Sequence, residues 1–239
     1  MQRNDGTGFN HLLRALPEDV NSRLTSGLRL VSLSLGKILH EPGETNRDVY
    51  FPIDAVVSIL YVTREGATAG LATIGNEGFV GISAFMGGSS TPSRAIVQSA
   101  GNAYRLSGSQ LNDEFRRDPE TQRTLLLYTQ SVITQIAQTV VCNRHHTIYQ
   151  QLSRWLLHTL DRLPKNHVTT TQEMIAGILG VRREGVTLAA KKLQEEGLID
   201  YARGRITIPD RAKLEQATCE CYGVVRRETH RLLPYSTRK

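Results

Sequence analysis

The chain has 239 residues, of which 39% are hydrophobic and 22% are charged, and this length and composition are typical of a folded protein with two domains. The first residues, "MQRNDGTGFNHLLRALPEDV", lack the long apolar segment of a signal peptide, and no stretch approaches eighteen uninterrupted apolar residues, so we expect a cytoplasmic protein without a membrane partner. The net charge is +6, and the three cysteines are too few and too clustered for a disulfide framework.

Residues 9–27 predict one or two short helices, because Phe9, Leu12, Leu13 and Leu16 share a face and a new helix can start at Pro17. From residue 28 to about residue 107 the pattern changes to short apolar runs, such as "VYFPI" and "AVVSILYV". Glycine-rich turns such as "EPGETN" and "REGATAG" separate these runs. This alternation predicts an all-β sandwich or barrel.

Residues 119–143 contain no glycine and no proline after the first position, and they predict one long helix. Apolar residues recur along it at spacings of seven, with a second set offset by three, which is typical of a helix that packs against a copy of itself. The expected dimer seam consists of Leu126, Thr129, Ile133, Ile136, Val140 and Asn143. Three heptads are few, so packing of this helix on its own β domain remains an alternative.

After a further amphipathic helix in "RHHTIYQQLSRWLLHTLDRL", residues 170–195 predict two helices joined by a tight turn at Gly180. Thr170 is the expected N-cap of the first helix, with Glu173 reaching back in a capping box. The second helix would bury its small and apolar residues, namely Val186, Ala189, Ala190 and Leu193. This arrangement predicts a helix-turn-helix whose second helix enters the DNA major groove.

The residue types on the outer face of the second helix suit that role. Arginine can donate two hydrogen bonds to guanine, glutamate can accept from cytosine, and a threonine methyl can contact thymine. "LIDYARGRITI" then predicts a strand, a tight turn and a strand, a wing whose arginines would contact phosphates. Lys192 would also meet phosphates. The candidate DNA-binding residues are Thr171, Gln172, Arg182, Arg183, Glu184, Thr187, Lys191, Arg203 and Arg205.

The distribution of charge agrees with this prediction. Residues 1–143 hold 12 Lys or Arg and 13 Asp or Glu, whereas residues 144–239 hold 17 and 10. The whole basic excess therefore lies in the half that carries the predicted helix-turn-helix, which favours a polyanionic partner there.

The stretch from Thr170 to Ile208 resembles the DNA-binding domain of the Crp/Fnr family of bacterial transcription regulators, and the pair Arg183-Glu184 matches the family's major-groove-reading pair. Upstream, "HEPGETNRDVYFP" and "GNEGFVG" resemble turns of the family's cyclic-nucleotide-binding-type β-roll. The resemblance implies an α+β protein with a β-roll (double-stranded β-helix) sensor domain at 1–118, a dimerisation helix at 119–144 and a winged helix-turn-helix domain at 145–239. It also implies a homodimer that binds double-stranded DNA, and RNA polymerase as a partner if the protein is an activator.

The resemblance breaks down at the effector site. Family members that bind cyclic AMP carry Gly-Glu-Leu, followed downstream by an Arg-Ser pair, where this chain has Gly81-Ile82-Ser83 and Ser93-Arg94. Ile136 and Ala137 stand where hydroxyl groups would meet the base. Each lost charge-assisted hydrogen bond at a buried phosphate costs about 1.5–3 kcal/mol. We therefore expect an effector other than cyclic AMP, and another small molecule, a protein signal or no ligand remain open.

Other functions are less favoured. The spacing Gly75-Gly78-Gly81 is not a nucleotide-binding fingerprint, and the chain has no nucleophile elbow and no HExxH motif, so no enzyme is expected. Residues 1–141 lack the cysteines of an iron–sulfur sensor. Cys219-Glu220-Cys221, with no second pair nearby in sequence, favours a structural role, and adjacent His145 and His146 would point to different helix faces. No cofactor and no metal are expected. The alternative function is a ligand-sensing module that acts on a protein partner without DNA.

Overall fold

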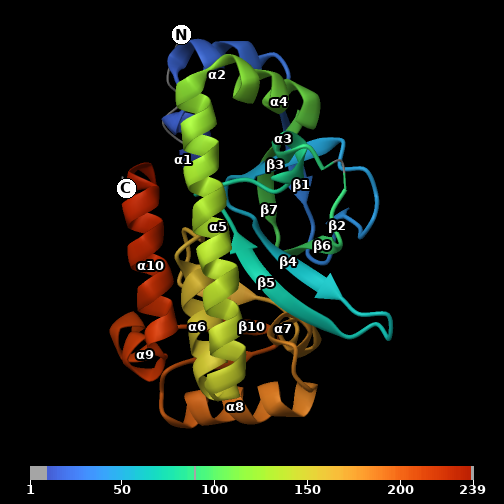
Figure 1. Ribbon diagram of the computed structural model, residues 1–239. Helices are drawn as coiled ribbons and strands as arrows, with labels where there is room; N and C mark the ends of the chain where they lie inside the picture. Colours follow the sequence, from blue (N-terminus) through green and yellow to red (C-terminus); the bar gives the residue numbers. More distant parts are fainter. Residues whose placement is uncertain (1–9, 89, 238–239) are drawn as a thin grey trace.

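The computed structural model describes residues 10–88 and 90–237, so Phe9 of the predicted first helix lies outside the described residues. Strands of the N-terminal half surround a core on one side of a long central helix, and a helical C-terminal half lies below them (Figure 1). The N-terminal strands are β1 Arg29–Leu33, β2 Ile38–His40, β3 Asp48–Pro52, β4 Val56–Val62, β5 Thr68–Ile74, β6 Ser93–Ser99 and β7 Gly101–Ser107. This half is the predicted β-roll.

The seven strands form two antiparallel sheets. One has the order β1-β7-β3 and the other β2-β6-β4-β5. Because neighbouring residues of a strand point to opposite sides, each sheet can turn apolar side chains inward, and residues such as Leu33, Val57, Val97 and Ala103 meet in a buried cluster. The non-consecutive strand order makes the sheets wrap around this cluster as a roll.

Short helices close the upper end of the roll. These are α1 His11–Ala15, α2 Glu18–Thr25, α3 Ser83–Met86 and α4 Gly108–Arg117. The buried side chain of Asn10 caps α1 by accepting from Leu13 N (3.1 Å), and its amide also donates to the carbonyl oxygens of Pro52 and Gly78. Nearby, Tyr128 of the central helix packs on Phe79 and donates to its carbonyl oxygen (2.7 Å). These contacts hold the upper part of the central helix against the roll.

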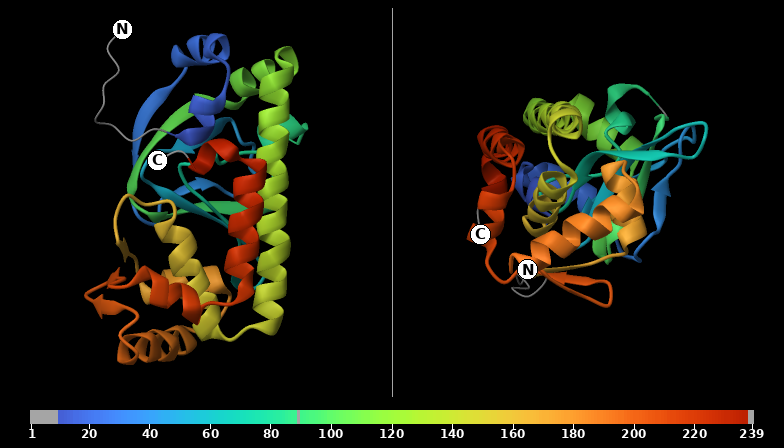
Figure 2. Two further views of the ribbon diagram at one scale, coloured as in Figure 1. Left: turned by 90° about the vertical axis from the view of Figure 1, so that its left-hand side faces the viewer. Right: turned by 90° about the horizontal axis from the view of Figure 1, so that it is seen from below.

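The central helix α5 spans Pro119–His145, with Asp118 as its N-cap and proline at its first position. Helix α10, Glu220–Leu232, runs alongside it in the opposite direction (Figure 2). Within the described residues α5 is the one helix long and apolar enough to cross a membrane, with a mean hydropathy of 1.3, but a core helix passes the same test. The roll and α10 cover two sides of α5, which accounts for much of its apolar composition.

The C-terminal half begins with α6, whose N-cap Thr147 forms a capping box with Gln150. Its strands pair antiparallel in the order β8-β10-β9. Its elements are α6 Ile148–Leu160, β8 His167–Thr169, α7 Gln172–Leu179, α8 Arg183–Glu195, β9 Asp200–Ala202, β10 Arg205–Thr207, α9 Arg211–Ala217 and α10, followed by a 3-10 helix at Pro234–Thr237.

The two halves share buried contacts. Leu60 of β4 belongs to the same apolar cluster as the residues of α6, α7 and α8. Gln98 of β6 donates to Thr159 (2.9 Å) and accepts from Trp155 Nε1 (3.3 Å), both on α6. Because all three side chains are buried and mutually hydrogen-bonded, the roll and α6 form one packed unit.

Candidate nucleic-acid interface

Helix α7 starts one residue later than the sequence predicted. Thr171, not Thr170, is the N-cap and accepts from Met174 N (3.1 Å). Thr170 is buried, and its backbone N–H donates to the carbonyl oxygen of Gly204 (2.9 Å), which ties it to the β9–β10 turn. Met174 therefore takes the third helical position that was predicted for Glu173, and the reciprocal capping box predicted there is wrong.

The turn between α7 and α8 depends on Gly180. Its φ is +68°, a left-handed conformation that glycine adopts without steric cost, and Val181 N then donates to Ala176 O (3.1 Å). Helix α8 follows at once, with Arg182 as its N-cap. Its inner face is buried as predicted, through Val186, Ala189, Ala190 and Leu193. The glycine turn and this apolar face together fix α8 across α7.

The opposite face of α8 is exposed to solvent. It presents Arg182, Arg183, Glu184, Thr187 and Lys191. In the part of the chain that the structure describes, no carboxylate forms an ion pair with Arg182 or Arg183. Arginine in the first turn works against the helix dipole, so the protein gains no local stability from these two cations. They are available to an anion from outside.

Two side chains link the helices on this face. The Thr187 hydroxyl lies 3.0 Å from Gln172 Oε1 and 3.1 Å from the carbonyl oxygen of Arg183. Gln172 is half-buried at the start of α7, so it holds the orientation of α8 while its own amide remains near the surface. Lys191 forms an exposed ion pair with Glu195 (3.7 Å), which contributes little stability and can be exchanged for a phosphate contact.

The β9–β10 hairpin forms the predicted wing. Arg203 (φ +50°) and Gly204 (φ +77°) occupy its two turn positions, and two consecutive positive φ values are typical of a tight type I′ hairpin. Arg203 is exposed at the tip. Arg205 contacts His167 Nδ1 (3.2 Å), and partial desolvation together with the cations Arg205 and Lys165 lowers the pKa of His167. A neutral His167 ring can accept the hydrogen bond from Arg205.

One exposed residue of α8 is absent from the residues predicted to bind DNA. Leu188 is 69% exposed, one turn after Glu184 and on the same side as Lys191. A leucine at that exposure has no core to fill, and its position among the outward polar residues makes it a candidate for contact with a thymine methyl group. Leu188 follows Glu184 by four residues, and this helical spacing alone places it on the outer face of α8. Only polar residues were identified on that face from the sequence.

The predicted seam of α5 divides into two sets. Leu126, Ile133 and Val140 are 50%, 57% and 63% exposed, and they form a stripe on the side of α5 that neither the roll nor α10 covers. Thr129 is buried and donates to Leu125 O (2.9 Å), and Ile136 packs against the core of the roll. The exposed stripe continues instead through Gln130 and Ala137.

Several of the candidate effector residues make contacts within the protein, whereas Ala137 lies on the exposed stripe of α5. Ser83 is buried and accepts from Asn46 Nδ2 (3.1 Å), and Arg94 forms an ion pair with Glu41 (2.8 Å). Ile82 and Ile136 pack against the same apolar core. Gly81 leads into α3 with φ +110°, and Ser93 begins β6.

A cavity lies between the β5–α3 turn, the end of α6 and α10. It measures about 550 Å³ and is lined by Glu77, Asp161, Arg162, Arg211 and Arg226, among others. Arg162 Nε donates to Glu77 (2.7 Å) across it, so part of its charge is already paired. The cavity lies between part of the roll and the C-terminal helices, and none of the candidate effector residues lines it.

Comparison with known proteins adds two family matches. Residues 30–118 match the cyclic nucleotide-binding domain, and residues 150–217 match the Crp-like helix-turn-helix domain. A search of curated proteins found no match. The helices and sheets described above correspond to these two domains, with α5 between them.

Solved structures share the fold at low sequence identity. FixK2 from Bradyrhizobium japonicum is 16% identical, with a TM-score of 0.66, covering 80% of this chain and 98% of its own. The c-di-GMP responsive global regulator CLP from Xanthomonas campestris is 16% identical, with a TM-score of 0.63, covering 80% and 99%. A transcriptional regulator of the CRP family from Thermus thermophilus is 20% identical, with a TM-score of 0.65, covering 78% and 95%.

Proposed function

The chain belongs to the Crp/Fnr family of transcription regulators, and from this premise we propose that it is a cytoplasmic homodimer that binds a near-palindromic DNA operator through α8. Two copies of α8, related by a two-fold axis, would enter successive major grooves about 34–36 Å apart. The protein has no enzymatic role in this proposal, and RNA polymerase is its partner where it activates transcription.

The observation that carries the proposal is the face of α8. Arg182, Arg183 and Glu184 occupy its first turn, are exposed and project away from a buried, apolar inner face. The first turn of a recognition helix is the part that reaches base edges, and arginine and glutamate have the hydrogen-bonding groups that distinguish guanine and cytosine. The wing arginines flank this face, where a DNA backbone would pass.

The proposed dimer uses the exposed stripe of α5. Leu126, Ile133 and Val140 are too large and too regularly spaced to be left in water along about four turns, and a second copy of the same stripe is the partner that we propose for them. Gln130 and Ala137 lie between them on the same side, and the small side chain of Ala137 allows a close helix–helix approach at that point.

The experiment is selection of bound sequences from random duplex DNA, followed by affinity measurement over a range of salt concentrations. We expect a two-fold symmetric site and a log–log salt slope of several units, because each phosphate contact displaces counterions. A flat salt dependence with no enriched sequence would reject DNA binding. It would favour the second candidate, a ligand-sensing module that acts on a protein, which the match of residues 30–118 to the cyclic nucleotide-binding domain supports.

Cyclic AMP is not the effector in this proposal. Ile82 offers no acceptor for a ribose hydroxyl, and Arg94 is engaged by Glu41 rather than free for a phosphate. A millimolar excess of cyclic AMP should therefore leave the melting temperature unchanged. A rise of several degrees would contradict the assignment, because a ligand that binds the folded state stabilises it.

A further inference from the structure

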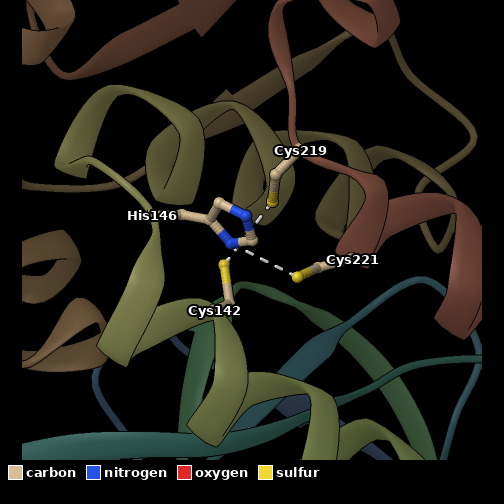
Figure 3. A group of neighbouring side chains, drawn as sticks. All are labelled: Cys142, His146, Cys219 and Cys221. Carbon is tan, nitrogen blue, oxygen red and sulfur yellow. Dashed lines mark hydrogen bonds between the residues drawn. The ribbon is translucent and has the colours of Figure 1, made fainter.

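Four side chains with metal-binding groups meet at the lower end of α5 (Figure 3). Cys142 and His146 lie one helical turn apart at the end of α5, and Cys219 and Cys221 lie at the N-cap and in the first turn of α10. Their ligand atoms all lie within 4.8 Å of one another. Along the sequence the cysteine pair of α10 is isolated, but the antiparallel packing of α10 on α5 brings two further ligands to it.

The spacing of these atoms suits a single ion. Cys142 Sγ lies 3.6 Å from Cys219 Sγ, and Cys221 Sγ lies 3.4 Å from His146 Nδ1. A tetrahedral zinc ion with Zn–S distances of about 2.3 Å and a Zn–N distance of about 2.0 Å would separate its ligands by about 3.5–3.8 Å. The two observed distances, 3.6 and 3.4 Å, are close to these values, and every other pair of the four ligand atoms lies within 4.8 Å.

The surrounding contacts also match a metal centre. His146 turns Nδ1 toward the sulfur atoms, while its Nε2 lies 3.3 Å from a carboxylate oxygen of Glu220, the arrangement that orients histidine ligands. Gln138 Nε2 donates to Cys221 Sγ (3.1 Å). Arg154 donates to Thr139 (3.3 Å), one turn before Cys142, and so places a positive charge near the thiolates. A zinc ion with three thiolates carries one net negative charge, which this guanidinium offsets.

The two helix ends favour the same assignment. The C-terminal end of α5 carries partial negative charge, which stabilises a cation, and the N-terminal end of α10 stabilises thiolates. All three cysteines are buried, and the His146 side chain is 14% exposed. A disulfide between Cys142 and Cys219 would leave Cys221 and His146 joined only by a hydrogen bond, so it explains only half of the cluster.

We propose that Cys142, His146, Cys219 and Cys221 bind one zinc ion in tetrahedral geometry, as a structural centre that joins the end of α5 to the start of α10. The thiol protons pass to solvent when the metal binds. His146 ends α5 and Thr147 caps α6, so the centre lies at the junction from which the DNA-binding half departs. Both α10 cysteines lie beyond residues 150–217, the part that matches the helix-turn-helix family.

The first experiment uses the full-length wild-type protein. Purified without chelator, it should contain about one zinc per chain by elemental analysis. After removal of zinc and addition of Co²⁺ alone, it should show the visible bands of tetrahedral cobalt and a thiolate-to-cobalt charge-transfer band. Failure to bind either metal would overturn the proposal, as would an octahedral cobalt spectrum. Loss of two mass units under non-reducing conditions, reversed by reductant and accompanied by no metal binding, would assign a disulfide instead.

The second experiment compares single variants. Cys142→Ser and Cys221→Ser should each lower zinc affinity at least tenfold and change the cobalt charge-transfer intensity, because one thiolate is lost. His145→Ala is the matched control, since His145 is exposed beside the cluster and contributes no ligand. Unchanged zinc affinity in both serine variants would also overturn the proposal. This readout is independent of DNA binding, so it holds or fails separately from the proposed function.

Discussion

At the level of single residues, the start of α8 presents two exposed arginines, Arg182 and Arg183, that form no ion pair in the part of the chain that the structure describes. The buried Val186 and Leu193 hold the helix on the protein, while Arg183 projects outward with no ion pair among the described residues. A side chain that contributes nothing to the fold can be removed without loss of stability. Its substitution therefore reports on binding alone.

Arg183→Ala should weaken binding to the operator by about 1–3 kcal/mol and relax the preference at one base position in each half-site, because one bidentate base contact is lost. Affinity is measured by titration against operator variants. Arg203→Ala is the comparison: at the wing tip it should weaken binding to all sequences alike. If Arg183→Ala weakened binding to all sequences equally, then Arg183 would contact phosphate and not a base.

His158 allows a prediction about pH. Burial lowers the pKa of His158 well below its usual 6.5, and the cations Arg162, Arg154 and Arg211 lower it further. As the pH falls through about 6.5, His158 therefore takes up a proton in the unfolded chain but stays neutral in the folded chain. Stability from this group is complete above pH 6.5 and is lost as the pH falls below it, at no more than about 1.4 kcal/mol per pH unit.

The measurement is the free energy of unfolding by denaturant at about pH 7.5, 6.0 and 5.0, which spans the ordinary histidine pKa. His158→Phe should remove this component of the acid sensitivity. The free energy of unfolding of the variant should therefore decrease less than that of the wild type as the pH falls. The exposed His145→Ala should follow the wild type at each pH. Parallel curves for wild type and His158→Phe would show that the ring titrates normally.

At the level of elements, α5 packs against the roll on one side and against α10 on another. Tyr128 and Gln135 face the roll, with Gln135 Oε1 accepting from Thr73 N (2.9 Å), and Gln138 faces α10. The remaining side carries the exposed apolar stripe. The residues of the heptad pattern therefore fall into two groups, one that packs in the protein's own core and one that belongs to the proposed dimer interface.

Ile133→Lys should weaken dimerisation at least tenfold, about 1.4 kcal/mol, because the two-fold axis would bring two copies of the new charge together. Sedimentation velocity over a range of concentrations measures this. Glu120→Lys is the control, since Glu120 is exposed in the first turn of α5 and is turned by about 120° around the helix from Leu126. Equal effects of the two variants would mean that the dimer, if one forms, uses another surface.

At the level of the whole molecule, the roll and the DNA-binding half are coupled through the β4–β5 hairpin. Thr68 Oγ1 donates to the carbonyl oxygen of Gly177 on α7 (2.9 Å), and Gly70 lies against Ile178. A Cβ atom at Gly70 would lie 2.5 Å from the Ile178 carbonyl oxygen, which only glycine avoids. The hairpin thus holds the first helix of the helix-turn-helix directly.

Gly70→Val should force α7 away from the hairpin, destabilise the protein by about 1–3 kcal/mol and split one calorimetric unfolding transition into two. Ala67→Val, at an exposed position of the same hairpin, should keep a single transition. If Gly70→Val also unfolds in one step with unchanged enthalpy, then the hairpin does not couple the two halves.

The sequence alone predicted the features that depend on local spacing. The short apolar runs and glycine-rich turns indicated an all-β domain, and the period of Val186, Ala189 and Leu193 indicated the second helix of a helix-turn-helix, because alternation and helical period are properties of neighbouring residues. The positive φ values at Gly180 and Gly204 are also local properties, because glycine adopts left-handed conformations without steric cost.

Tertiary structure decided what depends on residues far apart in the chain. It turned Thr129 inward, engaged Arg94 with Glu41, and placed Cys142 beside Cys219 from a helix end 77 residues away. The sequence period and composition describe one element at a time. The packing of the elements decides which side of a helix is covered and which partner a polar atom contacts. For this protein, the packing of α10 on α5 is the step that the sequence pattern did not contain.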